Sequence, residues 1–412
     1  MFIIILTLFS VWFIPLFKIW SEIAIWHILL ITTLYFILIN RHKFHSFLKV
    51  VKLNYGFLII ILLFPLFILT RDGFGDNLGA TLNDYILRGI CGLLLSLCIA
   101  THFRSENDKR LLFLILGIIL ACNALIGILQ VAKPNIFFGL PEKLAYQADI
   151  EHRFYDGRIR GMFIHVHIFS QHMLGLTSLF LAGIFFVTKK TKNFPGSIFF
   201  ILMTVLGVVS IIFTFTRSAY LGIIINILII VYFLIRYKLT KYKKSLKRLL
   251  FISGFLLISI FIITKAFDIF EMKESGRLIY LKNSGDKKRI ETFKLSIISF
   301  QNYPYYGTGG RIKLGDTAIH NIFLKTLVYY GIFGLLIYLF FYLSLFMKIK
   351  AISKKYLIYK IGLFLWLASY LLYGMVHTAG FWLGGLIEWT FVGLMLSLIQ
   401  PRNNLKSSLI MG

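Results

Sequence analysis

Residues 287–334 read KKRIETFKLSIISFQNYPYYGTGGRIKLGDTAIHNIFLKTLVYYGIFG, a long polar, basic and aromatic stretch with hydrophobic segments on both sides. It begins with the basic cluster Lys287, Lys288 and Arg289, passes a region rich in Pro and Gly, and ends at His320 and Asn321 beside an apolar segment. Most of the remaining chain is hydrophobic. The segments around this stretch therefore decide the fold, and the stretch itself is the first candidate for a functional loop.

The composition is that of an integral membrane protein. Hydrophobic residues make up 58% of the 412 residues, charged residues make up 15%, and the mean hydropathy is +0.82. These values exclude a soluble domain, which needs more charged residues to cover its surface. The apolar runs have the length of about 20 residues that spans a bilayer as a helix, and they lack the alternation of a barrel strand. We therefore predict an all-α polytopic membrane protein.

The hydropathy pattern predicts about twelve transmembrane helices in a single bundle over 1–412. The expected spans are 2–17, 22–39, 55–70, 85–102, 111–131, 161–188, 197–213, 219–235, 249–265, 322–346, 358–375 and 384–400. The first of these is predicted to be a span and not a removed signal peptide, because no basic segment precedes it. The cysteines Cys91, Cys98 and Cys122 all lie in apolar segments, which favours small buried residues over a metal site or disulfides.

The basic residues predict the orientation. The net charge of +27 lies mostly in the connections after spans two, four, six, eight and ten, so it indicates topology and not a nucleic-acid partner. In the short connections on the other side, Lys18, Arg71 and Arg217 are the only basic residues. Both termini are therefore expected in the cytoplasm. The two longest loops, 132–160 and 266–318, then lie outside the cell membrane, and the second lies between spans nine and ten.

Three basic side chains on the external face are the main candidates for function. Arg217 lies in a short turn between two spans, where an arginine is costly unless it faces protein, water or an anion, although many such arginines only reach the membrane surface. Arg289 precedes an amphipathic helix in which Ile290, Phe293, Ile297 and Phe300 recur at helical spacing. His320 is a residue type that accepts protons near neutral pH, although a single His at the end of a span is more often structural.

Other polar residues of the same face are weaker candidates. Arg158, Arg160, His165, Asn321 and Arg311 are possible substrate-binding residues. His165, His167 and His172 raise the question of a metal, but residues at i and i+2 point to different faces of a helix and no nearby carboxylate completes a site. No metal and no cofactor is predicted.

Several arginines and one histidine at the membrane surface fit a lipid-linked diphosphate. Guanidinium groups bind phosphates through two parallel hydrogen bonds, and a histidine can remove a proton from an acceptor hydroxyl. The charged group of such a lipid lies at the surface while its tail stays in the bilayer. A transporter of polyprenyl-linked sugars would bind the same group, but its spans are expected to contain breaks and buried charges, whereas the spans here appear as largely uninterrupted apolar runs.

Four motifs, in order, resemble the superfamily of bacterial O-antigen ligases and O-antigen polymerases, which are membrane glycosyltransferases with a GT-C-like bundle. They are Arg160-Gly161-Met-Phe-Ile-His165, Thr216-Arg217-Ser218-Ala219, Arg289 with Pro304-Tyr-Tyr-Gly307-Thr-Gly309, and His320-Asn321-Ile-Phe-Leu324 with Gly331-Ile-Phe-Gly334. The resemblance covers roughly residues 155–340. In two places the chain departs from the family pattern, with Val166-His167 in place of Pro-Asn and with Tyr329 in place of a carboxylate.

The resemblance implies an enzyme of the bacterial inner membrane. Its donor would be a glycan on undecaprenyl diphosphate, and its acceptor a sugar hydroxyl of lipid A-core in lipopolysaccharide biosynthesis. Arg217 and Arg289 would hold the diphosphate, and His320 would act as the general base of a metal-independent, inverting transfer. A polymerase that extends a lipid-linked glycan remains the alternative, and a flippase is the less favoured one. The twelve-span layout with one compact long loop favours a ligase.

Overall fold

A computed structural model describes residues 2–13, 18–20, 23–72, 88–132, 159–163, 166–186, 197–214, 216–236, 254, 290–309, 319, 321–376 and 386–399. Its helices are α1 (Phe2–Phe13), α2 (Ile25–Ile39), α3 (Arg41–Asp72), α5 (Arg88–His102), α6 (Glu106–Ala132), α9 (Val166–Phe186), α10 (Ser197–Phe213), α11 (Arg217–Arg236), α14 (Ile322–Ala351), η3 (Lys354–Tyr356), α15 (Leu357–Val376) and α16 (Leu386–Leu398). Residues 290–302 are also helical. The short strands β1 (Lys18–Trp20) and β2 (Ile23–Ala24) pair antiparallel.

The predicted all-helical membrane fold is confirmed in its main features. A helix coincides with each predicted span except 249–265, which lies outside the described residues apart from Gly254. Within the described ranges, six helices are long and apolar enough to cross a membrane, and four shorter apolar helices accompany them. The number of twelve spans stays a prediction. One local expectation was wrong, because the basic segment after span two is not a loop but the first turns of α3.

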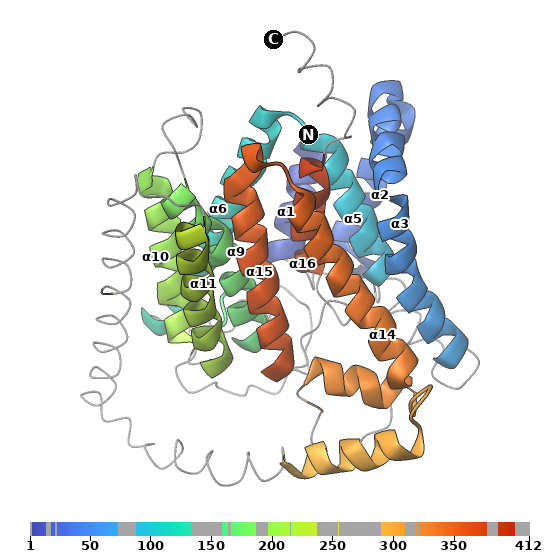
Figure 1. The fold of residues 1–412 in the computed structure, drawn as a ribbon. Helices are drawn as coiled ribbons and strands as arrows, with labels where there is room; N and C mark the ends of the chain where they lie inside the picture. The colour runs from blue at the N-terminus through green and yellow to red at the C-terminus, as the bar shows by residue number, and fades with distance from the viewer. Residues whose placement is uncertain are drawn as a thin grey trace.

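Helix α9 lies at the centre of the bundle. It packs against α15 and α10 and also touches α11 and α6, while α16 packs against α5 (Figure 1). Close approach depends on small residues in α9: a Cβ on Gly183 would overlap the ring of Phe200 in α10. Membrane helices associate through such small-residue contacts, because lipid supplies no hydrophobic drive between apolar surfaces. The position of α9 matters because its first turns carry several polar side chains.

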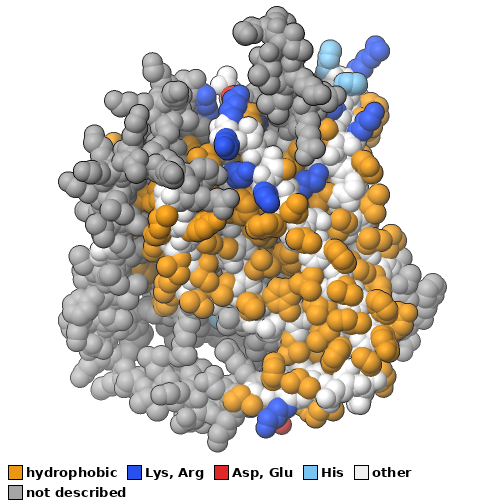
Figure 2. Space-filling model, in the orientation of Figure 1, with side chains coloured by type: hydrophobic (Ala, Val, Ile, Leu, Met, Phe, Trp, Pro, Cys, Tyr) orange, Lys and Arg blue, Asp and Glu red, His pale blue; other side chains and the backbone are white. Residues whose placement is uncertain are grey.

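The two ends of the bundle differ in charge. Figure 2 shows a broad apolar band on the visible face, with Lys and Arg side chains gathered above it. At this end, which we call the basic end, Lys355 pairs with Glu106 at 3.0 Å and the Tyr356 hydroxyl donates to the same carboxylate at 2.6 Å. These contacts join the start of α6 to the start of α15. The opposite end, below in Figures 1 and 2, is called the site end.

The helix α14 is broken at Gly331, which has φ 64° and ψ −165°. Residues 322–330 lie across the site end next to the helix 290–302, and the rest of α14 then crosses the bundle (Figure 1). The expectation of largely uninterrupted spans was therefore wrong for span ten. A single residue in the left-handed region changes the direction of the chain, and glycine is the residue type that adopts this region without steric cost.

Candidate functional site

The polar features of the site end come from several helix termini. The helices α6, α10 and α15 end there, and α9, α11, α14 and α16 begin there (Figure 1). The sequence therefore brings residues near 130, 160, 217, 321, 373 and 388 to the same half of the molecule. Three local structures in this region, the turn before α9, the start of α11 and the break in α14, contain or adjoin the family motifs.

The turn at 159–163 is fixed by Gln130, in the last turn of α6. The Gln130 side chain donates to the Gly161 carbonyl at 2.7 Å and accepts from the amides of Arg160 and Gly161 at 2.9 and 3.0 Å. The amide of Ile159 donates to the carbonyl of Phe213 at 3.2 Å, which joins this turn to the end of α10. Arg160 is buried. Its segment is thus held against the turn that precedes Arg217.

Arg217 is the first residue of α11. The first turn of α11 is closed by the Thr216 carbonyl, which accepts from the amides of Ala219 and Tyr220. The Tyr220 hydroxyl donates to the Ile212 carbonyl at 2.7 Å and so joins α11 to the end of α10. An arginine at the first position of a helix adds its charge to the positive end of the helix dipole, so this position favours an anion. The Arg217 side chain lies outside the described part of the structure.

The segment Pro304–Gly309 and the break in α14 cross each other closely. Four backbone hydrogen bonds join them: Thr308 N to Val328 O, Gly309 N to Tyr329 O and Ile332 N to Pro304 O, each 2.9 Å, and Phe333 N to Tyr305 O, 3.4 Å. We call this crossing the glycine clasp. Gly307 and Gly331 both have positive φ, and a Cβ on either would overlap the backbone of the opposite segment. The clasp explains the two glycine motifs and ties the helix 290–302 to α14.

Asn321 caps the start of α14. Its side-chain oxygen accepts from the amides of Phe323 and Leu324 at 2.9 and 3.0 Å. An N-cap of this kind satisfies amide groups that have no partner within the helix. Asn321 was predicted as a possible substrate-binding residue, and the structure gives its side-chain oxygen a local role. The cap also fixes the point at which the chain enters α14, directly after position 320.

The other predicted site residues are not described. Arg158, His165, Arg289, Arg311 and His320 lie outside the described residues, so no distances among them are available and their roles stay predictions. Of the predicted residues, the structure brings Arg160 and the backbone of Arg217 to one region through the hydrogen bond between Ile159 and Phe213. Asn321 also lies at the site end, where it caps the segment 322–330 that leads to the glycine clasp.

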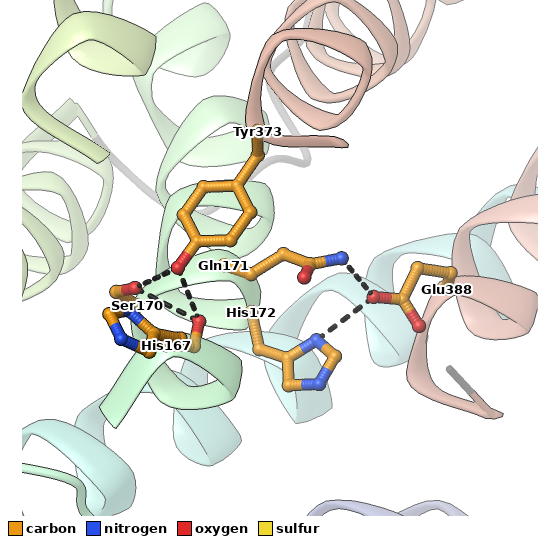
Figure 3. Close-up of polar contacts among 6 residues, drawn as sticks. All are labelled: His167, Ser170, Gln171, His172, Tyr373 and Glu388. Carbon is orange, nitrogen blue, oxygen red and sulfur yellow. Dashed lines mark hydrogen bonds and ion pairs between the residues drawn. The ribbon is translucent and has the colours of Figure 1, made fainter. Parts of the chain in front are cut away.

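Sequence reasoning missed a buried polar cluster between α9, α15 and α16 (Figure 3). Glu388 Oε1 accepts from Gln171 Nε2 at 2.9 Å and lies 3.2 Å from His172 Nδ1. Glu388 is 2% exposed and His172 is 5% exposed. His172 thus has a carboxylate neighbour that the sequence did not suggest, because Glu388 lies more than 200 positions later in the chain.

A second set of hydrogen bonds anchors the start of α9 to α15. The Tyr373 hydroxyl donates to the His167 carbonyl at 2.7 Å and lies 2.8 Å from the Ser170 hydroxyl (Figure 3). Within the described residues, no group of three His, Cys, Asp or Glu side chains is arranged to hold a metal ion. The signal that would have found the cluster is Glu388 itself, the lone acid in an apolar segment, since ionisable residues inside membranes are rare and usually functional.

Comparison with known proteins supports the resemblance drawn from the motifs. A family model described as O-antigen ligase matches residues 200–339. The matched region contains the Thr216-Arg217 turn, Arg289, the glycine clasp and His320-Asn321, whereas Arg160 and His165 lie before it. A comparison with curated proteins gives no match. Over residues 200–339, about a third of its length, this chain is similar to the O-antigen ligase family.

Proposed function

We propose that this protein transfers a glycan from undecaprenyl diphosphate to a sugar hydroxyl of lipid A-core on the periplasmic face of the bacterial inner membrane. The family segment supports a membrane glycosyltransferase-like enzyme of O-antigen processing. The observation that carries the proposal is the convergence at one end of the bundle. The site end holds the start of α11 at Arg217, the turn that contains Arg160, and the glycine clasp.

The proposed mechanism needs two anion-binding groups and one base. Arg217 and Arg289 bind the diphosphate and stabilise the negative charge that develops as it leaves. His320 accepts the proton of the acceptor hydroxyl, whose oxygen forms a bond to the anomeric carbon. The bond between that carbon and the diphosphate oxygen breaks, and undecaprenyl diphosphate departs with the electron pair. Attack from the side opposite the leaving group inverts the anomeric centre.

Variants of the proposed residues test the assignment in reconstituted membranes. His320→Ala and Arg217→Ala should each reduce glycan transfer by at least about 100-fold, the scale on which a general base or a charge-stabilising group contributes. Arg236→Ala is the matched control for Arg217, because Arg236 ends the same helix at the basic end. His45→Ala is the control for His320, since His45 is exposed at the basic end. Full activity of either site variant would contradict the assignment.

The acceptor is tested with the same preparation. Lipid-linked glycan is supplied with and without lipid A-core, and the products are separated by size and by lipid anchor. Glycan on lipid A-core supports a ligase, whereas longer lipid-linked chains in the absence of core identify a polymerase, the alternative that shares the same family segment.

Two features of the described residues, the break at Gly331 and the buried Glu388, are also typical of transporters, which bind substrates at interrupted helices and carry ionisable residues inside the membrane. Here the break is stabilised by four hydrogen bonds to the segment 304–309, so it has a structural partner within the loop. Movement of lipid-linked glycan across vesicle membranes without any transfer product would favour the transporter over the enzyme.

A further inference from the structure

The helix 290–302 has three different faces, although the sequence predicts only an apolar and a polar one. With about 100° between successive residues, each face collects residues three and four positions apart. The buried face carries Thr292, Ser296 and Ser299; the exposed apolar face carries Ile290, Phe293 and Ile297; the exposed polar face carries Glu291, Lys294, Gln301 and Asn302. The helix thus turns hydroxyl groups towards the protein and leaves much of its apolar surface uncovered.

The exposed apolar face continues into other exposed apolar side chains. Tyr303, Tyr305 and Tyr306 follow the helix and are all more than half exposed. The rings of Tyr305 and Tyr306 pack beside Phe333, with centroid distances of 6.3 and 5.3 Å. Phe333 itself begins a row of exposed apolar residues on α14, namely Phe333, Leu336, Phe340 and Leu343.

This arrangement matches the boundary between lipid and water. The apolar surface of α14 faces acyl chains if α14 crosses the membrane, and the helix 290–302 extends that surface at the site end. Figure 2 shows the apolar band reaching this end, with charged side chains only on its lower edge. Tyrosines are enriched at membrane interfaces because the ring is apolar and the hydroxyl is polar. A water-facing surface would instead leave these apolar side chains uncovered.

We propose that Ile290, Phe293 and Ile297, together with Tyr303, Tyr305, Tyr306 and Phe333, form a lipid-binding surface that lies within the interface of one membrane leaflet. The occupant is the leaflet that surrounds the site end of the spans. Glu291 and Lys294 then lie on the water side, and the hydroxyl face points into the protein.

The surface has a consequence that rests on the proposed function. In the sequence, Arg289 directly precedes Ile290, the first described residue of this helix. A helix held at the depth of the lipid head groups begins at the depth of a lipid diphosphate. Under the proposed function, the same leaflet holds the helix and the lipid diphosphate, so both lie at the depth of the lipid head groups.

Two neighbouring isoleucines provide a matched test of lipid contact. Ile297 belongs to the apolar face, and Ile298, which is also exposed, lies between Lys294 and Asn302 on the polar face. Ile297→Cys and Ile298→Cys are made in a Cys122→Ala background, because Cys91 and Cys98 are buried and Cys122 is partly accessible. Each variant is spin-labelled in vesicles of phosphatidylethanolamine and phosphatidylglycerol, and collisions with oxygen and with a water-soluble nickel complex are measured.

The label at 297 is expected to collide mainly with oxygen, which concentrates in lipid, and the label at 298 mainly with nickel. Equal nickel accessibility at both positions would overturn the proposal. Gel filtration of each variant checks that the label has not unfolded the protein. The glycan-transfer assay is run separately: if the labels differ as expected but no glycan is transferred, the lipid-binding surface stands and only the proposed function is wrong.

Discussion

Glu388 is a carboxylate inside an apolar helix, and its neighbours contact one of its two oxygens. Gln171 donates a hydrogen bond to it and His172 lies within ion-pair distance, so one oxygen of Glu388 is contacted by two nitrogen atoms. Such a group holds the starts of α9 and α16 together. Removing one member of a buried polar group leaves the others without partners. The resulting loss of folding free energy exceeds the net stability that the intact group contributes.

Substitution of Glu388 should therefore reduce stability in a way that depends on the replacement. Glu388→Ala leaves two nitrogen atoms without their acceptor, at about 1–3 kcal/mol each, and lowers the midpoint of thermal unfolding measured by gel filtration after heating in detergent. Glu388→Gln keeps the shape and an acceptor oxygen for Gln171, so its midpoint should fall much less. Equal midpoints for both variants would argue against the importance of the hydrogen bonds.

Among the elements, the glycine clasp is the one that positions the loop. The four hydrogen bonds of the clasp tie the helix 290–302 and the segment that follows it to the first part of α14. Both glycines have positive φ, a conformation that costs other residues about 1–2 kcal/mol, and both lack space for a Cβ.

Gly331→Ala should release the loop without unfolding the bundle. The added Cβ overlaps the backbone of Tyr305, so the four hydrogen bonds weaken and glycan transfer falls. Trypsin should then cut more rapidly at Lys294, which is exposed on the helix 290–302. Gly56→Ala is the control, because no atom lies near a Cβ at that position. Unchanged proteolysis and transfer in Gly331→Ala would show that the clasp does not control the loop.

Some of these structural features could be predicted from the sequence alone, and others could not. Hydropathy and segment length located the spans, because burial in lipid depends on local composition. The break at Gly331 was not predictable in the same way, since its partner is a turn more than 20 residues earlier. The pairing of Gln171 with Glu388 joins residues 217 positions apart, and only the packing of α9 against the start of α16 brings them together. Family motifs, by contrast, suggested Arg217, Arg289 and His320, whose roles stay predictions.

For the whole molecule, the difference between the two ends predicts the orientation. The basic residues at the basic end include Lys43, Lys109, Lys348 and Lys355, and positively charged residues are retained on the cytoplasmic side. We therefore predict that the site end faces the periplasm, where lipid-linked glycans are available on the outer leaflet under the proposed function.

The orientation is tested by thiol labelling in intact cells with a reagent that does not cross the membrane. Asn302→Cys, exposed at the site end, should react in intact cells, whereas His45→Cys, exposed at the basic end, should react only after the membrane is permeabilised. The same Cys122→Ala background serves for both. Labelling of His45→Cys in intact cells would reverse the orientation and move the proposed site to the cytoplasmic face.

The clasp also bears on the design of hybrid proteins from two relatives. Its four backbone hydrogen bonds do not depend on side-chain identity, apart from the requirement of glycine at 307 and 331, and the Thr308 hydroxyl adds a hydrogen bond to the Val328 carbonyl at 3.2 Å. Hybrid proteins that take the helix 290–302 from one relative and residues 322–351 from another should therefore keep the junction, provided that both glycines are retained. The helix 290–302 and the span can then be exchanged as separate segments.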